Sequence, residues 1–226
     1  MPGRDIKPMA ARPVLVWDLP VRLTHWAAAV LVLVLWLSER WNWMGWHVLA
    51  GEALLALVIF RLLWGLAGSE TARFARFLAA PGAAVRHLRG LFVRAPDHEV
   101  GHNPAGGWMV VVLLGLLAGE CLSGVFVNND VADQGPFTDS MPAWLANLVT
   151  DLHTILFQVI VGAVVLHVAA IGVYALAKGQ NLVRPMVTGR KLLPGPMPAP
   201  IMAGLGRAMA LAALAVALAG GIAWFG

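Results

Sequence analysis

Five apolar stretches alternate with polar segments along the 226-residue chain. A helix that crosses a bilayer needs about 20 mostly apolar residues, and each stretch is close to that length. The predicted spans cover residues 23–38, 46–67, 107–127, 152–177 and 208–225. The pattern therefore predicts an all-α integral membrane helical bundle with five transmembrane helices.

The composition supports a membrane location. Hydrophobic residues make up 59% of the chain and charged residues only 12%, whereas soluble domains average about 25% charged residues. This balance excludes a soluble enzyme, a disordered chain and a nucleic-acid-binding module. The single cysteine, Cys121, excludes disulfide frameworks, thiolate zinc sites, iron–sulfur clusters and covalent c-type haem.

The basic residues predict the orientation, because Lys and Arg collect on the cytoplasmic side of a membrane protein. Those on the N-terminal side are Arg4, Lys7, Arg12, Arg22, Arg73, Arg76, Arg86, Arg89, Arg94, Lys178, Arg184, Arg190, Lys191 and Arg207. The opposite side has Arg40, and its longer loop holds Asp130, Asp133 and Asp139. The N-terminus is thus expected in the cytoplasm and the C-terminus on the outer side. The leader is charged and contains prolines, unlike a cleaved signal peptide, so the first span is expected to be retained.

Three regions are predicted along the chain. Residues 1–22 form a cytoplasmic N-terminal segment, residues 23–192 form a four-helix core, and residues 193–226 form a proline-rich linker and the fifth helix. Within the core, residues 71–94 mix aromatic and aliphatic residues with arginines. This pattern indicates one or two amphipathic helices lying in the membrane interface, the alternative being a solvated basic loop.

Four histidines lie within or at the ends of the predicted spans: His25, His47, His153 and His167. His153 and His167 are 14 residues apart, which places them near one face of a helix and about 21 Å apart along its axis. Span one starts inside and span two starts outside, so His25 lies at the inner level and His47 at the outer level. The depths predict the pairs His25 with His167 and His47 with His153. The other three histidines, His87, His98 and His102, lie in the cytoplasmic loop and are expected to be solvated.

Two imidazoles that face each other across a bundle are the axial ligands of a six-coordinate b-type haem. The pattern therefore predicts two non-covalent haems b with these four histidines as ligands to the iron. Zinc would require three or four ligands at one depth. An intramembrane histidine can also serve only as a hydrogen-bond partner between helices. The glycines Gly51, Gly115, Gly119, Gly124 and Gly162 would let a macrocycle approach, but they are equally typical of helix packing.

Charged residues within the spans have two interpretations each. Glu52 and Glu120 would serve proton transfer at an outer quinone site, or act as interfacial or interhelical hydrogen-bonding groups. Arg22, Arg61 and Arg73 lie near the inner level and would pair with haem propionates, or extend to the lipid headgroups. The sequence contains no P-loop, dinucleotide-binding or hydrolase motif, so no catalytic residues are assigned.

Several short motifs resemble the bacterial cytochrome b561 family, which includes the cytochrome b subunits of nickel–iron hydrogenases. They read VWD at 16–18 with VRLTHW at 21–26, RLLWG at 61–65, GHNPAGG at 101–107 and NLVRPMVTGRK at 181–191. The resemblance covers roughly residues 13–192 and includes the order of the histidines. It implies a four-helix core with two stacked haems b in a bacterial inner membrane. The fifth helix departs from the family's minimal four-helix pattern, which leaves the oligomeric state and the partner surface open.

The family implies electron transfer between membrane quinone and a redox partner, such as a periplasmic cytochrome c, a hydrogenase or a dehydrogenase. Two other functions are compatible with the sequence. One is a transporter or scaffold with structural histidines, although a substrate site would gather its polar groups near the midplane. The other is a stand-alone quinone-linked oxidoreductase. The sequence does not decide whether the chain is itself an enzyme.

Overall fold

The computed structural model describes residues 12–93, 99–128, 135, 137–195 and 197–225. Predictions that concern Arg4, Lys7, Arg94, His98, Asp130, Asp133 and the side chain of Asp139 lie outside this part of the chain. The elements are β1 (Arg12–Leu15), α1 (Leu19–Arg40), α2 (Met44–Ala67), η1 (Glu70–Ala72), α3 (Phe74–Phe77), α4 (Pro81–Arg89), α5 (Pro104–Gly124), η2 (Thr138–Ser140), α6 (Ala143–Val173), η3 (Tyr174–Lys178), α7 (Val183–Thr188), β2 (Arg190–Leu193) and α8 (Leu205–Phe225).

Five of the described helices are long and apolar enough to cross a membrane, as the hydropathy pattern predicts. Their ends differ from the predicted ones. Helix α1 begins at Leu19 because the Asp18 side chain accepts a hydrogen bond from the backbone N–H of Val21 and caps the helix. Helix α6 begins at Ala143, nine residues before the predicted start, since its first turns contain polar residues that hydropathy alone assigns to a loop.

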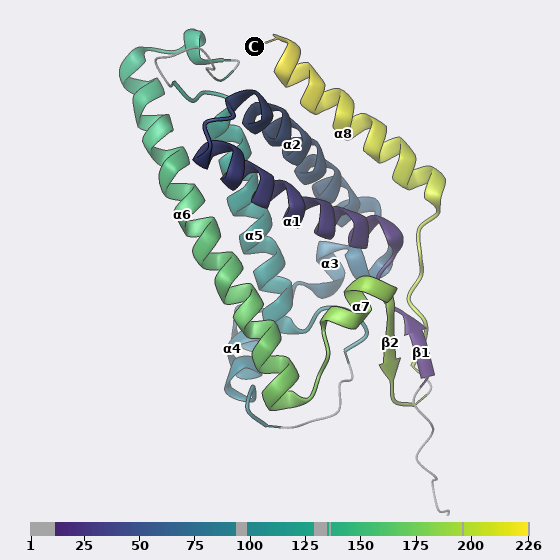
Figure 1. The fold of residues 1–226 in the computed structure, drawn as a ribbon. Helices are drawn as coiled ribbons and strands as arrows, with labels where there is room; N and C mark the ends of the chain where they lie inside the picture. Colours follow the sequence, from purple (N-terminus) through teal and green to yellow (C-terminus); the bar gives the residue numbers. More distant parts are fainter. Residues whose placement is uncertain (1–11, 94–98, 129–134, 136, 196, 226) are drawn as a thin grey trace, which may run out of the picture.

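Helices α1, α2, α5 and α6 form the core of the bundle (Figure 1). Each packs on the next one in this order, and buried Leu54 and Val58 of α2 meet Leu114 of α5. Helices α1 and α6, by contrast, make few or no direct backbone contacts. The four-helix core is therefore open along the seam between its first and last helices.

Helix α8 packs along α2 on the outside of the four-helix core (Figure 1). Ala208 and Ala215 are buried in one cluster with Phe60 and Trp64 of α2. Small side chains on α8 let the two helices approach closely, which is the usual way in which helices associate in membranes. The fifth helix covers α2 and leaves the seam between α1 and α6 uncovered.

A two-stranded antiparallel sheet, which hydropathy does not predict, joins the N-terminal segment to the end of the core. β1 pairs with β2, with Arg12 opposite Leu193 and Leu15 opposite Arg190. The backbone N–H groups of Val16 and Trp17 both donate to the carbonyl of Gly189, at 2.8 and 3.1 Å. Residues 12–22 are thus packed against the core. Hydropathy does not reveal this pairing, because a four-residue strand is too short to show a clear alternation of polar and apolar residues.

The segment 71–94 contains two short helices, α3 and α4, preceded by the 3₁₀ turn η1. Phe77 of α3 is buried whereas Arg76 is exposed, so α3 is amphipathic. In α4, Ala84 is buried while Val85 and Leu88 are about half exposed. The predicted helices are present, and their location in the membrane interface stays a prediction.

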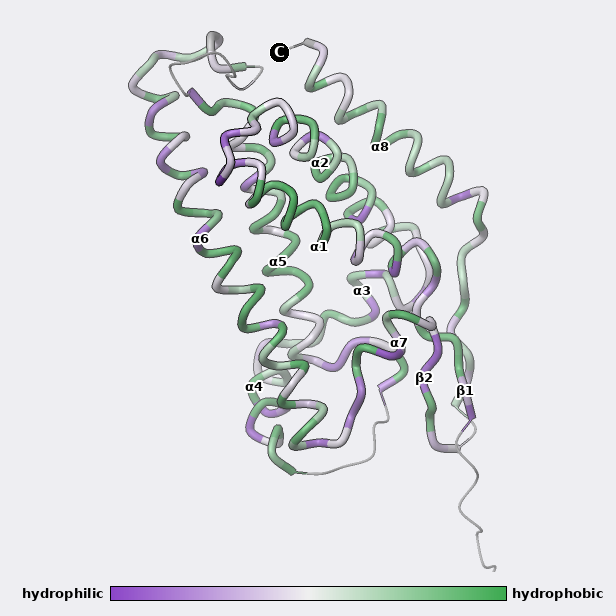
Figure 2. The backbone as a smooth tube through the Cα atoms, viewed as in Figure 1, coloured by the Kyte–Doolittle hydropathy of each residue, from purple (hydrophilic) through white to green (hydrophobic). Residues whose placement is uncertain are grey.

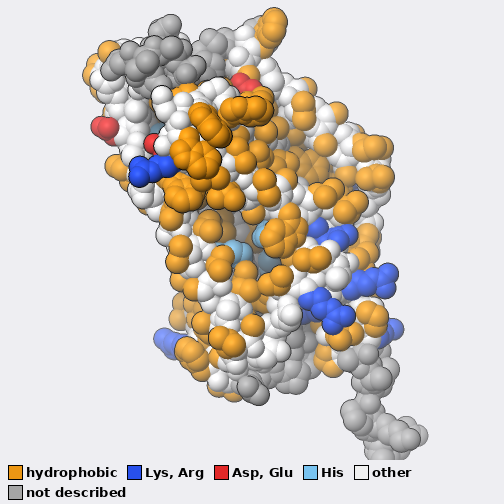
Figure 3. All heavy atoms as spheres, in the orientation of Figure 1, with side chains coloured by type: hydrophobic (Ala, Val, Ile, Leu, Met, Phe, Trp, Pro, Cys, Tyr) orange, Lys and Arg blue, Asp and Glu red, His pale blue; other side chains and the backbone are white. Residues whose placement is uncertain are grey.

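Hydrophobic residues dominate the middle of the long helices, and hydrophilic residues collect at their ends (Figure 2). In the space-filling view, most of the visible Lys and Arg side chains lie toward the end that carries the sheet and α7 (Figure 3). The same view shows histidine side chains at the bottom of a hollow among hydrophobic ones. The polar groups of the hollow are therefore shielded by an apolar surface.

Gly189→Ala is expected to destabilise the fold by about 1–3 kcal/mol, because a backbone with φ near +78° strains any side chain. The added Cβ would also lie 2.7 Å from the backbone oxygen of Trp17. The N–H of this residue bonds the carbonyl of Gly189 just after β1, so the clash would disturb that contact. The measurement is the melting temperature of the detergent-solubilised protein by circular dichroism. Gly179→Ala is the control, since its φ of +69° is similar but its Cβ would have no neighbour within 4 Å. Equal losses in the two variants would contradict the packing argument.

Candidate functional site

Two pairs of histidines face each other across the open seam of the four-helix core. The ring centres of His25 on α1 and His167 on α6 are 6.3 Å apart. Those of His47 on α2 and His153 on α6 are 6.5 Å apart. We call the first the sheet-end pair, because it lies toward β1 and β2, and the second the turn-end pair, because it lies next to the α1–α2 turn. These are the same two pairs that the predicted depths of the four histidines indicate.

The turn between α1 and α2 positions His47. Asn42 adopts a left-handed conformation with φ 56°, which asparagine tolerates better than most residues. The N–H of Trp43 donates to the carbonyl of Ser38 at 2.7 Å, and the chain reverses within a few residues. This tight reversal places the first turn of α2 against the last turns of α1, so that His47 lies at the same level as Leu35 and Ser38.

Backbone carbonyls determine the tautomer of the turn-end histidines. Nδ1 of His47 lies 3.1 Å from the carbonyl oxygen of Leu35, and Nδ1 of His153 lies 3.1 Å from that of Glu120. A carbonyl oxygen only accepts, so each Nδ1 must carry the proton. The lone pair of each ring is then on Nε2, which is the arrangement that a metal-ligating histidine needs.

The spacing of both pairs fits a metal held between two imidazoles. Two metal–nitrogen bonds of about 2 Å, with about 1 Å more from each nitrogen to its ring centre, require ring centres about 6 Å apart. The observed 6.3 and 6.5 Å agree with this requirement. No group of three or more His, Cys, Asp or Glu residues that could hold a metal ion occurs in the described part of the chain. The histidines therefore suit an axial pair, as in a haem, better than a tetrahedral site.

Glu120 is an acidic residue that contacts the turn-end pair. Its Oε1 lies 3.4 Å from Nε2 of His153, and its Oε2 is buried without a hydrogen-bond partner in the described structure. Ordinarily a buried carboxyl oxygen has a partner, so this one leaves bonding capacity for a group that enters the site. Glu52, by comparison, is only partly buried and has no side-chain bond of this kind among the described residues.

The glycines that the sequence singles out fall into separate groups. A Cβ on Gly124 would lie 3.1 Å from the His153 ring, so the absent side chain gives this histidine its room. Gly51 and Gly119 face leucines of neighbouring helices and serve helix packing. Gly162 is exposed and, at 100° per residue, points away from His153 on the opposite face of α6. The suggestion that it accommodates a macrocycle between the two histidines of α6 is therefore wrong.

The three arginines near the sheet-end pair have different surroundings. Arg22 precedes His25 by three residues on α1. One of its terminal nitrogens donates to the carbonyl of Val187, and its Nε is buried without a partner in the described part of the chain. Arg61 is 9% exposed, donates to the carbonyl of Ala72 and lies over the Phe74 ring. It is enclosed by protein and does not extend to the headgroups. Arg73 bonds the carbonyl of Gly68 at the end of α2.

His102 is partly buried and packed between two aromatic rings, so the expectation that it is solvated is wrong. Its ring lies 4.5 Å from both the Trp17 ring and the Phe77 ring, and its Nδ1 is inaccessible. Burial, followed by the positive charges of Arg61 and Lys191, lowers the pKa of His102 to about 3. His87 is also engaged, because its Nε2 lies 2.8 Å from the hydroxyl of Tyr174. Hydropathy could not show this, since both residues lie in segments that look like polar loops.

The residues of the VWD and RLLWG motifs meet in the same region. The buried carboxylate of Asp18 accepts a hydrogen bond from the indole N–H of Trp64 at 2.9 Å, in addition to capping α1. The carbonyl of Val16 accepts from the Thr71 hydroxyl at 2.6 Å. These motifs therefore fix the sheet end of the bundle, which positions the first turns of α1 and with them His25.

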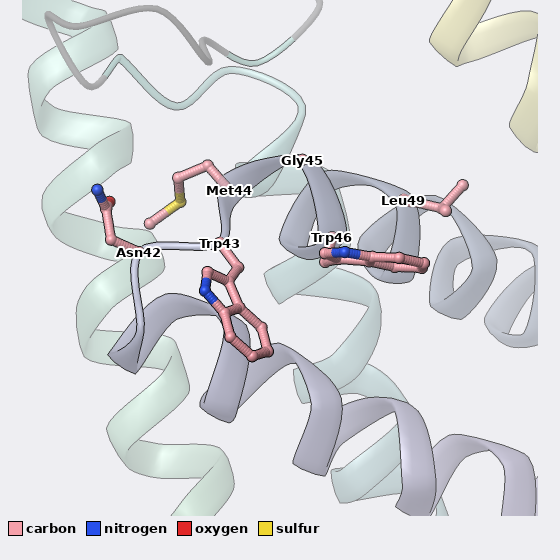
Figure 4. A pocket seen from close by; sticks show the side chains of 6 residues that line it. All are labelled: Asn42, Trp43, Met44, Gly45, Trp46 and Leu49. Atoms are coloured by element: carbon pink, nitrogen blue, oxygen red, sulfur yellow. The ribbon is translucent and has the colours of Figure 1, made fainter.

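A pocket of about 580 Å³ lies at the α1–α2 turn (Figure 4). It is lined by Asn42, Trp43, Met44, Gly45, Trp46 and Leu49, and the side chains of Trp43 and Trp46 border it. Both tryptophans are more than half exposed, as is typical of aromatic residues at a membrane–water boundary. None of the four paired histidines lines this pocket.

A five-helix membrane bundle with paired histidines in its core has the architecture of a membrane-bound cytochrome. The sequence profile of the prokaryotic cytochrome b561 family matches residues 16–189 of the chain. The chain belongs to this family, and it is a membrane protein that transfers electrons by means of b-type haem. A relative in Rhizobium leguminosarum bv. viciae, the probable Ni/Fe-hydrogenase B-type cytochrome subunit, is 24% identical over 221 residues. The alignment covers 82% of this chain and 92% of that protein, and no solved structure matches.

His102 is expected to make the fold sensitive to acid. The unfolded chain takes up a proton at this residue below about pH 6.5, whereas the folded chain does so only near pH 3. Acid therefore favours unfolding, by up to about 1.4 kcal/mol per pH unit within this window. In His102→Gln, the melting temperature should fall less steeply between pH 7 and pH 5 than in the unaltered protein. Parallel curves for the two proteins would contradict the assignment.

Proposed function

We propose that the protein passes electrons across the membrane through two haems b, one between His25 and His167 and the other between His47 and His153. The observation that carries this proposal is the spacing of both pairs, 6.3 and 6.5 Å between ring centres. Membership in the b561 family supports it, because b-type cytochromes hold their haem without covalent bonds. When bound, a haem iron with two axial imidazoles supplies one-electron transfer and keeps no open position for oxygen.

The residues of the chain would hold the haems and exclude water. The pairs are separated along α6 by 14 residues, or about 21 Å, so each haem would lie near one membrane surface. The long helices that carry the pairs are mostly apolar along their length, which would keep the surroundings of the haems apolar. Arg22 is the better partner for a haem propionate, because its Nε is buried and unpaired while Arg61 is already enclosed between Ala72 and Phe74.

Membrane quinone and a second redox protein would be the electron-transfer partners. The relative's name supports a hydrogenase as the second partner, and a periplasmic cytochrome c or a dehydrogenase would meet the same need. The basic residues at the sheet end support a cytoplasmic location for that end, which would put the turn end and the C-terminus on the periplasmic side. The protein would then connect a periplasmic reaction to the quinone pool of the inner membrane.

Substitution of the histidines tests the two haem sites. Protein purified from haem-replete cells should show a sharp reduced-minus-oxidised band of low-spin haem b. His25→Ala and His167→Ala should each remove the same half of the haem, and His47→Ala and His153→Ala the other half. His87→Ala is the control and should keep both haems, because its ring bonds Tyr174 outside the pairs. A colourless protein, or loss of different haems within one pair, would overturn the proposal.

Reporter fusions test the orientation. Alkaline phosphatase folds only outside the cytoplasm, so it should be active when fused after residue 225 or within the α5–α6 loop. It should be inactive when fused between α4 and α5, where the basic residues predict a cytoplasmic location. Green fluorescent protein should give the opposite pattern at the same positions. The reverse result would place the turn-end pair on the cytoplasmic side.

A further inference from the structure

The two histidine pairs differ in what their Nδ1 atoms contact. Both histidines of the turn-end pair have two oxygen partners at Nδ1, a backbone carbonyl and a serine hydroxyl. Nδ1 of His25, in the sheet-end pair, is buried and has no hydrogen-bond partner among the described residues. For His167, too, no hydrogen bond occurs within the described part of the chain. The pairs are equal in spacing but unequal in hydrogen bonding.

The two turn-end histidines meet the same local arrangement on different helices. On α1, His47 Nδ1 lies 3.1 Å from the carbonyl of Leu35 and 3.4 Å from the hydroxyl of Ser38. On α5, His153 Nδ1 lies 3.1 Å from the carbonyl of Glu120 and 2.9 Å from the hydroxyl of Ser123. In each case the serine follows the carbonyl residue by three positions, and both serines are buried.

The direction of these hydrogen bonds follows from the serines. Each hydroxyl donates to the carbonyl three residues earlier, at 3.1 Å for Ser38 and 2.9 Å for Ser123. With its proton engaged there, the hydroxyl oxygen offers a lone pair to the imidazole N–H. The Nδ1–H of each turn-end histidine thus faces two acceptors, which draw the proton away from the ring and increase the electron density on Nε2.

At the sheet end, no polar group in the described part of the chain bonds Nδ1 of His25, and the neighbouring polar side chains bond backbone carbonyls instead. The hydroxyl of Thr24 bonds the carbonyl of Pro20, and the indole N–H of Trp26 bonds that of Met186. Arg22 donates to the carbonyl of Val187. The His25 ring instead lies edge-on to the Trp26 ring, 5.0 Å between centres. None of these contacts increases the basicity of the imidazole.

We propose that Ser38 and Ser123 are positioning residues that make the turn-end pair the site of lower reduction potential. This inference rests on the proposed function, since it requires an iron between each pair. A more basic imidazole stabilises ferric over ferrous iron, so hydrogen bonds at Nδ1 lower the potential of the iron that the ring holds. With iron bound at both pairs, transfer of one electron from the turn-end site to the sheet-end site would release free energy, because the sheet-end site would have the higher potential. The relay is biased toward the sheet end.

The test is a redox titration of the purified haem-loaded protein, followed by optical and electron paramagnetic resonance spectra. Two midpoint potentials are expected, and His47→Ala or His153→Ala should abolish the lower one. Ser38→Ala and Ser123→Ala should each raise that lower potential, with a change of up to about tenfold in the reduction equilibrium, or about 59 mV for one electron. The higher potential should not move. Ser123→Thr keeps a hydroxyl and should restore the value of the unaltered protein.

Two control variants separate the hydrogen bond from other effects. Ser140→Ala removes a serine hydroxyl that also bonds a carbonyl three residues earlier but contacts no paired histidine, and it should leave both potentials unchanged. Glu120→Gln removes the carboxyl group beside His153 while keeping the carbonyl and Ser123. A shift in Glu120→Gln with none in the serine variants would overturn the proposal in favour of a charge effect.

The remaining outcomes are also decisive. Unshifted potentials in both serine-to-alanine variants, or loss of the higher potential with His153, would overturn the inference while leaving the two-haem function intact. If both alanine variants lose the turn-end haem, Ser38→Cys and Ser123→Cys decide, because a thiol is a much weaker acceptor than a hydroxyl and should raise the lower potential. An unshifted potential in both cysteine variants would assign the serines a purely structural role. Absence of haem from the unaltered protein would refute the proposed function itself.

Discussion

The separation between α6 and the α1–α2 hairpin is the constraint on which the rest of the structure depends. His153 and His167 lie on one helix and must meet partners on two different helices at nearly the same distance, 6.5 and 6.3 Å between ring centres. Helix α5 acts as the spacer, because it packs on both α2 and α6 while α1 and α6 scarcely touch. A closer approach of α6 to α1 would close the space between the rings, and a wider one would leave the histidines unable to share a ligand.

The periphery of the molecule supports this separation. At one end, Asp18 joins the cap of α1 to Trp64 of α2, and the β1–β2 sheet packs beside them. At the other end, the short turn through Asn42 holds His47 against α1. Helix α8 packs on α2 away from the seam, so it adds to the hairpin without entering the core. Contacts at both ends and along α2 thus fix the α1–α2 hairpin, and α6 is positioned relative to it.

Hydropathy was sufficient for the class and the number of the spanning helices, because lipid requires long apolar segments with internally bonded backbones. It failed where tertiary contacts decide burial. His102 lies in a polar segment, yet it packs between Trp17 and Phe77, and β1 pairs with a strand far away in sequence. Gly162 lies between His153 and His167 in sequence, yet it faces away from His153. The errors at His102 and β1 could not be avoided from residue type and spacing alone, whereas the nine-residue spacing between His153 and Gly162 was enough to place them on opposite faces.

The sequence by itself determined the levels of the four histidines, since helix periodicity and alternating span direction are local properties of the chain. Only the tertiary structure decided how far apart the paired rings stand, because that distance depends on how four helices pack. It also decided which pair has hydrogen-bond partners at Nδ1. Ser38 and Ser123 are unremarkable in sequence, and they meet His47 and His153 only because a tight turn and a helix crossing bring them there.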